Sequence, residues 1–107
     1  MFDIVRYQRD DGSEPYTDWY RKLRDGIAKA AIAMRLSRLK DGNLGDCKAV
    51  GQGVQELRIR TGPGYRVYFG VEGTTLVILL LGGDKSTQTN DIRKAQALWT
   101  EWKARQP

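Results

Sequence analysis

The chain has 107 residues, of which 40% are hydrophobic and 29% are charged, so we expect one globular domain spanning residues 1–107 and no wholesale disorder. Its formal net charge of +5 and isoelectric point of about 9.6 favour an anionic partner: nucleic acid, an acidic protein or a membrane surface. One cysteine, Cys47, excludes an internal disulfide, and the lack of histidine excludes histidine general bases and most zinc sites.

No segment of the sequence has the pattern of a signal peptide or of a membrane-spanning helix. The first residues lack the apolar core of a signal peptide, and the longest apolar run, Leu76 to Leu81, is too short to span a bilayer. We therefore predict a cytoplasmic protein without a membrane partner.

The first half of the chain predicts one strand and two helices. A strand is expected from Phe2 to Tyr7, followed by a turn and a helix with Ser13 as its N-cap. Apolar residues at helical spacing mark this first helix: Tyr16, Trp19, Tyr20 and Leu23. After a break at Asp25-Gly26, a second helix is expected from Ile27 to Lys40, and the two helices form an αα-hairpin.

The second helix has two apolar stripes. The main stripe consists of Ala28, Ile32, Leu36 and Leu39. A second stripe includes Ile27 and Met34, which we expect to lie in the core, although such a stripe also leaves room for a partner.

The second half predicts strands and a last helix. A short strand is expected at Lys48–Val50, and alternating strands at Val54–Arg60 and Tyr65–Val71 flank a glycine-rich hairpin loop. The apolar run Thr74–Leu81 reads as a central strand covered on both faces. A helix capped by Thr87 or Thr89 then presents an apolar face of Ile92, Ala95, Leu98 or Trp99, and Trp102.

This order of elements predicts an α+β fold. The N-terminal strand and αα-hairpin precede an antiparallel meander, because strands joined by tight hairpins must run antiparallel, and a C-terminal helix follows. The helices before and after the meander are expected to cover its apolar face.

The alternation of the meander places arginines on one polar face. Arg58 and Arg66 lie on neighbouring strands across the hairpin, and Lys85 follows the central strand. An arginine fork donates two hydrogen bonds to a phosphate, and a tyrosine such as Tyr68 can stack on a splayed base. Further binding residues are expected at Lys48, Arg60, Gln88 and Asp91.

Such a face suits RNA cleavage without histidine, metal or cofactor. RNA supplies its own nucleophile, the 2′-OH, and fixed cations stabilise the charge that develops on phosphorus. A lysine that is desolvated beside other cations can have a lowered pKa and act as a base. The simpler alternative is that these arginines are solvated surface residues, which is equally compatible with the composition.

A family resemblance adds to this reading. Glu56-Leu57-Arg58, Gly64-Tyr65-Arg66-Val67 and Gly82-Gly83-Asp84-Lys85, followed by Gln88 and Asp91, resemble the RelE/ParE superfamily of toxin–antitoxin toxins. Within it, the chain is most similar to the HigB-like, phage-related addiction module killer proteins. The resemblance implies a RelE-like fold for the whole chain.

The resemblance also implies an activity and partners. RelE-like and HigB-like toxins enter the ribosomal A site and cut messenger RNA, so the chain is expected to be a ribosome-dependent mRNA interferase that inhibits translation. Arg66 corresponds to the family's phosphate-binding arginine, and Arg58 and Lys85 to its other basic residues. The expected partner is a cognate helix-turn-helix antitoxin, with which the toxin forms a hetero-oligomer.

Two departures keep other functions open. No tyrosine of the C-terminal helix matches the base-stacking residue of RelE, and the histidines of some HigB-like toxins are missing. The first alternative is a ParE-like inhibitor of DNA gyrase, and the second is a non-catalytic, phage-derived module of a protein complex.

Overall fold

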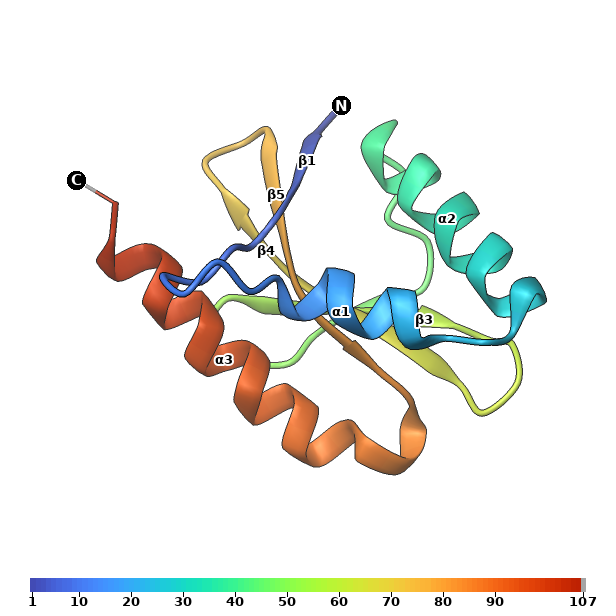
Figure 1. Ribbon diagram of the computed structural model, residues 1–107. Helices are drawn as coiled ribbons and strands as arrows, with labels where there is room; N and C mark the ends of the chain where they lie inside the picture. Colours follow the sequence, from blue (N-terminus) through green and yellow to red (C-terminus); the bar gives the residue numbers. More distant parts are fainter. Residues whose placement is uncertain (107) are drawn as a thin grey trace.

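A computed structural model describes residues 1–106 and shows a five-stranded sheet with helices on both faces (Figure 1). The strands lie in the order β1-β5-β4-β3-β2. The elements are β1 (Asp3–Arg6), α1 (Pro15–Lys22), α2 (Gly26–Lys40), β2 (Cys47–Ala49), β3 (Val54–Ile59), β4 (Tyr65–Glu72), β5 (Leu76–Gly83), a 3₁₀ turn (Lys85–Thr87) and α3 (Gln88–Ala104). The predicted α+β class and order of elements are confirmed.

The antiparallel meander is also confirmed, and it runs from β2 to β5. The strand β1 adds to the far side of β5 in parallel orientation, with Val5 opposite Ile78, so the sheet is mixed. A bulge in the β4–β5 pairing near Tyr68 and Phe69 accommodates one extra residue of β5. Within residues 1–106 no helix has the length and apolarity needed to cross a bilayer.

Each face of the sheet has its own apolar core. One core lies under α1 and α2, where Tyr16 and Ile32 pack with Leu57, Val67 and Phe69 of the sheet. The other lies under α3 and contains Val54, Tyr68, Ile78, Ala95 and Trp99. Both faces of β5 are therefore covered, as its continuous apolar run predicts.

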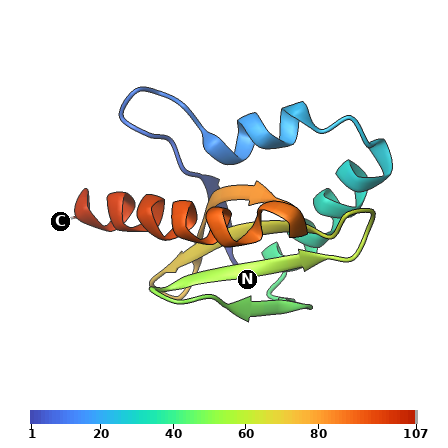
Figure 2. The ribbon, with the colours of Figure 1, turned by 90° about the horizontal axis from the view of Figure 1, so that it is seen from below.

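The placement of α3 corrects one prediction. The helices before and after the meander do not share its apolar face, because α3 lies on the opposite face, across the strands (Figure 2). This is the face that carries the polar residues of β3 and β4, and along each strand it changes from apolar, at Val54 and Tyr68, to charged, at Arg58 and Arg66. Its apolar positions pack under α3, and its polar positions lie near the start of that helix.

Two glycines let tryptophans pack directly on the sheet. Gly82 lies under the ring of Trp19 from α1, and Gly70 lies under the ring of Trp99 from α3. A methyl group at position 70 would come within 2.5 Å of the Trp99 ring. The tryptophans therefore belong to the two cores, as their helical spacing indicates.

Two local predictions are wrong. The N-cap of α1 is Glu14 rather than Ser13. The backbone amide of Ser13 donates a hydrogen bond to the side chain of Asp11 in the preceding turn. Ile27 and Met34 lie outside the core with 77% and 56% of their surface exposed, because α2 turns only its Ala28–Ile32–Leu39 side toward the sheet.

The contact between Gly70 and Trp99 gives a stability prediction. Gly70→Ala should lower the free energy of unfolding by about 1–3 kcal/mol, because the buried indole has little room to move away from a new methyl group. Chemical denaturation measures the change. Gly26→Ala is the control, since a methyl group there meets no atom within 4 Å, and equal loss in both variants would contradict the packing.

Candidate anion-binding site

Two arginines face each other across the β3–β4 ladder. Arg58 is directly opposite Arg66 in the register of the two strands, so their side chains leave the same face of the sheet. Like charges in this position repel one another and weaken strand pairing unless something compensates them. The sequence prediction that these two arginines come together is borne out by this register.

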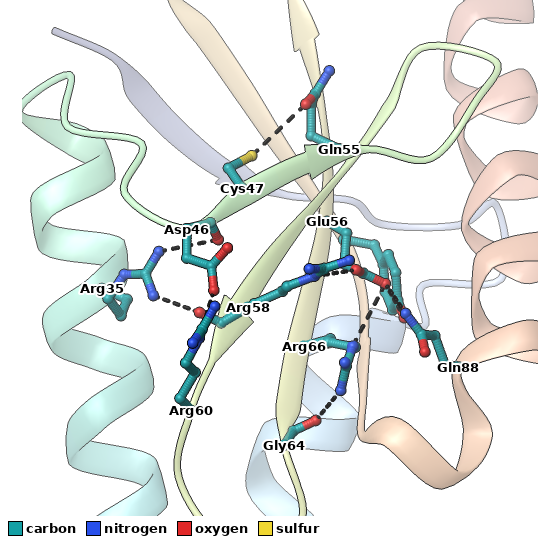
Figure 3. Close-up of polar contacts among 11 residues, drawn as sticks. Arg35, Asp46, Cys47, Gln55, Glu56, Arg58, Arg60, Gly64, Arg66 and Gln88 are labelled. Carbon is teal, nitrogen blue, oxygen red and sulfur yellow. Dashed lines mark hydrogen bonds and ion pairs between the residues drawn. The ribbon is translucent and has the colours of Figure 1, made fainter.

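Glu56 supplies the compensation. Its side chain is fully buried, and its two oxygens are shared among four neighbours (Figure 3). Oε1 accepts a hydrogen bond of 2.9 Å from Nε of Arg58, while Oε2 lies 3.7 Å from Nε of Arg66. Oε2 also accepts hydrogen bonds from the Tyr68 hydroxyl at 3.2 Å and the Gln88 amide at 2.9 Å.

The four partners keep this carboxylate ionised. Burial by itself would raise the pKa of Glu56, but the hydrogen bonds from Arg58, Gln88 and Tyr68 outweigh burial and hold it below its usual value. The neighbouring charge of Arg66 acts in the same direction. One buried negative charge therefore lies between two arginine side chains, and the cluster carries a net positive charge.

Both arginines contact Glu56 through Nε, so their outer nitrogens point elsewhere. Nη1 of Arg66 donates to the carbonyl of Gly64. Nη1 and Nη2 of Arg58, and Nη2 of Arg66, donate to no group within residues 1–106. These nitrogens are available to an anion. A hydrogen bond to the buried carboxylate holds the Arg58 guanidinium, whereas the largely buried Arg66 guanidinium lies at ion-pair distance from it and its Nε has no hydrogen-bond partner among the described residues.

Lys85 adds a third cation beside the hairpin. Its backbone amide donates to the carbonyl of Pro63, which ties the start of the 3₁₀ turn to the β3–β4 loop. A side chain at Gly64, where φ is +78°, would lie 3.1 Å from Nη1 of Arg66 and 3.6 Å from Cβ of Lys85. The glycine thus leaves open the space between these two cations.

The helix α3 reaches the cluster through its first turn. Gln88 is the first residue of α3 and donates to Glu56 across 32 positions of the sequence. Asp91, one turn later, is buried over Gly83 and accepts a hydrogen bond from Thr87. The two arginines, Lys85 and the start of α3 therefore meet at one end of the sheet. We call the set Glu56, Arg58, Arg66, Lys85 and Gln88 the arginine cluster.

Tyr68 has a different role from the predicted one. Its side chain is completely buried beneath α3, so the ring offers no surface on which a base could stack, and that prediction is wrong. Its hydroxyl donates to Glu56, and burial together with the nearby carboxylate raises the pKa of the phenol. Tyr68 is a support of Glu56.

Two other predicted binding residues, Arg60 and Lys48, lie beside the arginine cluster and form no ion pair with Glu56. Arg60 is 84% exposed and forms an ion pair of 2.9 Å with Asp46, so it lies apart from the Glu56 contacts (Figure 3). Lys48 lies opposite Glu56 in the β2–β3 register and is exposed on the outermost strand. Both extend the positive surface from the cluster toward that edge of the sheet.

Sequence reasoning missed Glu56 as the centre of the site. A glutamate on an alternating strand reads as one more solvated polar residue, and only the packing of α3 on that face reveals its burial. A signal was present in the spacing, because Glu56, Arg58 and the paired strand's Arg66 and Tyr68 all share one face. The contribution of Gln88 depends on where α3 begins, which local spacing does not reveal.

The arrangement is suited to binding a phosphate and stabilising its charge. The groups that could move a proton are few: Tyr68 and Asp91 are buried, and Glu56 is occupied by its four partners. Lys85 is exposed and forms no ion pair with the described residues. Within residues 1–106 there is also no group of three His, Cys, Asp or Glu side chains placed to hold a metal ion.

Comparisons with known proteins cover the whole of this site. Residues 18–100 match the model of a family described as phage-derived Gp49-like proteins (DUF891). An uncharacterized protein of Haemophilus influenzae is 51% identical over 86 residues, which are 80% of this chain and 87% of that protein. The family match runs from α1 into α3 and includes every residue of the arginine cluster.

Glu56→Gln tests the role of the buried carboxylate in stability. The substitution keeps the shape but leaves two arginines without their counter-charge, so the free energy of unfolding should fall by about 1–3 kcal/mol at neutral pH. Because the folded-state pKa of Glu56 is lowered, its contribution is complete above the unfolded pKa and is lost as the pH falls through the folded value. The acid-side slope of stability against pH should therefore be shallower in the variant.

Asp46→Asn provides the matched control for that measurement. Asp46 also pairs with an arginine, but Arg60 is largely exposed, and exposed pairs contribute little to stability. Equal effects of the two substitutions in denaturation curves recorded from neutral to acidic pH would contradict a special role of Glu56.

Proposed function

The chain belongs to the family of phage-derived Gp49-like proteins, a toxin–antitoxin-associated family, and from that membership we propose that it is the toxin of a type II toxin–antitoxin module. We propose further that it is a ribosome-dependent mRNA endonuclease, acting as RelE-like and HigB-like toxins do. The observation that supports this activity is the arginine pair, whose Nε atoms face one buried carboxylate while outer nitrogens stay free.

The cluster can serve the chemistry of RNA cleavage. The 2′-oxygen of the RNA attacks the adjacent phosphorus as the 2′-hydroxyl proton passes to solvent. The bond from phosphorus to the 5′-oxygen breaks, the 5′-oxygen takes up a proton, and a 2′,3′-cyclic phosphate and a 5′-hydroxyl result. Arg58 and Arg66 bind the non-bridging oxygens and stabilise the charge that grows on them in the transition state. Fixed donors are effective here because Glu56 orients them before the substrate arrives.

Lys85 is the proposed proton donor to the leaving 5′-oxygen. Its place beside Gly64 and Arg66 is close to the phosphate that the arginines would hold, and it is exposed to substrate. Gln88 and Tyr68 act through Glu56 and position it. Asp91 supports the start of α3, and Lys48 and Arg60 provide weaker contacts to the flanking backbone.

The shortage of proton-transfer groups explains why a ribosome would be needed. Among the described residues near the arginines, general bases are few: Glu56 and Asp91 are buried and Asp84 accepts hydrogen bonds from Ser86, which leaves Lys85 as the most exposed proton-transfer group. A large assembly that holds the messenger in an attack-ready conformation lowers the barrier by alignment, which the small protein alone cannot provide. The same shortage favours the rival function, a protein-binding gyrase inhibitor that cuts nothing.

Primer extension on a translated messenger separates these functions. In a purified translation system, codon-registered cuts that disappear when ribosomes are omitted support the nuclease. Intact messenger with normal protein synthesis contradicts it, and DNA cleavage by gyrase in a parallel assay would then identify the rival.

Arg66→Ala is the variant that tests the cluster. Loss of this arginine should reduce ribosome-dependent cleavage by at least about a hundredfold, since each fixed donor to a transition-state charge is worth roughly that factor. The fold should remain, because the side chain contributes little to either apolar core.

Arg9→Ala is the control for Arg66→Ala. Arg9 pairs with Glu101 near the far end of α3, both side chains are exposed, and cleavage should be unchanged. A folded Arg66→Ala protein that cuts messenger as well as the wild type would refute the assignment.

A further inference from the structure

The helix α2 is apolar on the side that faces away from the sheet. Ile27, Ala30, Ala33 and Met34 are all exposed, and we call these four residues the α2 stripe. Ile27 and Met34 are among the few large apolar side chains left open to solvent, at 77% and 56%. From Gly26 to Met34, α2 has apolar side chains on both its sheet side and its outer side, with Lys29 as its one charged residue, and this pattern indicates a missing neighbour on the outer side.

The positive charge of the molecule is concentrated around this stripe. Residues 21–40 hold seven Lys and Arg against one Asp, a net charge of +6, whereas the other residues hold eleven against twelve. The single acidic residue, Asp25, is occupied as the N-cap of α2, where its carboxylate accepts from two backbone amides.

We propose that the α2 stripe is a docking surface for an acidic amphipathic helix of the neutralising partner. Aliphatic side chains of that helix would cover Ile27 and Met34, while its carboxylates would lie near exposed cations such as Arg38. The two alanines between the large residues allow a helix to approach closely. The identity of the partner as the antitoxin rests on the proposed function, but the surface and its chemistry do not.

Two other occupants fit the surface less well. A second copy of this chain would bring two segments of charge +6 together, and their repulsion opposes self-association. RNA would be attracted by the charge, but α2 contains no aromatic residue on which a base could stack, and aliphatic side chains gain nothing from a phosphate backbone. An acidic helix satisfies both the charge and the apolar stripe.

The docking surface and the arginine cluster lie on opposite faces of the sheet. The helix α2 covers the face of Leu57, while Glu56 and the arginines face α3. They are nevertheless joined, because Arg35 of α2 donates to the backbone carbonyl of Arg58. A partner on α2 would therefore leave the cluster uncovered while contacting the helix that holds one of its strands.

The binding probe is the antitoxin that the proposed function requires as the partner of this chain, and its binding is measured by calorimetry. The double variant Ile27→Gln, Met34→Gln should bind at least ~tenfold more weakly, or about 1.4 kcal/mol. Its melting temperature should be unchanged, because both side chains are exposed. Arg38→Glu should weaken binding in the same way, and added salt should weaken the wild-type complex.

Two controls separate the surface from the rest of the molecule. Val5→Thr removes part of another exposed apolar side chain, on β1, and Arg66→Ala alters the cluster; both should bind the antitoxin as the wild type does. Wild-type affinity in the double variant overturns the proposal, as does a wild-type chain that forms no complex. If the double variant instead loses binding to a short single-stranded RNA, the surface belongs to RNA and the proposal also fails.

Antitoxin binding and messenger cleavage are measured separately, so failure of the proposed function can be distinguished from failure of the docking surface. A chain that binds the antitoxin through α2 but leaves translated messenger intact would refute the nuclease and leave the docking surface in place. A double variant that still cuts messenger but is no longer neutralised supports both.

Discussion

The candidate site depends on one buried negative charge. Glu56 is fully buried, and it makes the pairing of Arg58 with Arg66 across two strands tolerable. Without it, two like charges would oppose each other within a sheet. With it, Arg58 is hydrogen-bonded through Nε, Arg66 lies at ion-pair distance, and both keep outer nitrogens for an anion. The same carboxylate therefore contributes to stability and to the shape of the site.

The second constraint is the position of α3. Its first residue, Gln88, completes the contacts of Glu56, and its Trp99 packs on Gly70 of the central meander. Burial of Tyr68 and Glu56 follows from this packing, since both lie on the face that α3 covers. The helix thus converts a solvated polar strand face into a water-poor environment in which charge–charge contacts are stronger.

The sequence predicted those features that local patterns determine. Alternation along β3 and β4, with glycines in the loop between them, was sufficient to place Arg58 and Arg66 side by side. The sequence could not show which face of the sheet α3 covers, because an amphipathic helix has the same spacing of apolar residues on either side of a sheet. The burial of Tyr68 and the exposure of Ile27 depend on that tertiary choice, so local spacing misassigned both.

Glu56 orders two arginines before any substrate binds, and nuclear magnetic resonance of arginine Nε–H groups can detect this order in the free protein. We expect two slowly exchanging signals, from Arg58 and Arg66, that are distinct from those of exposed arginines such as Arg60 and that shift when a ribonucleotide phosphate is added. In Glu56→Gln both signals should move to the positions of free arginine. Fast exchange and averaged positions in the wild-type protein would show that Glu56 does not order the two arginines.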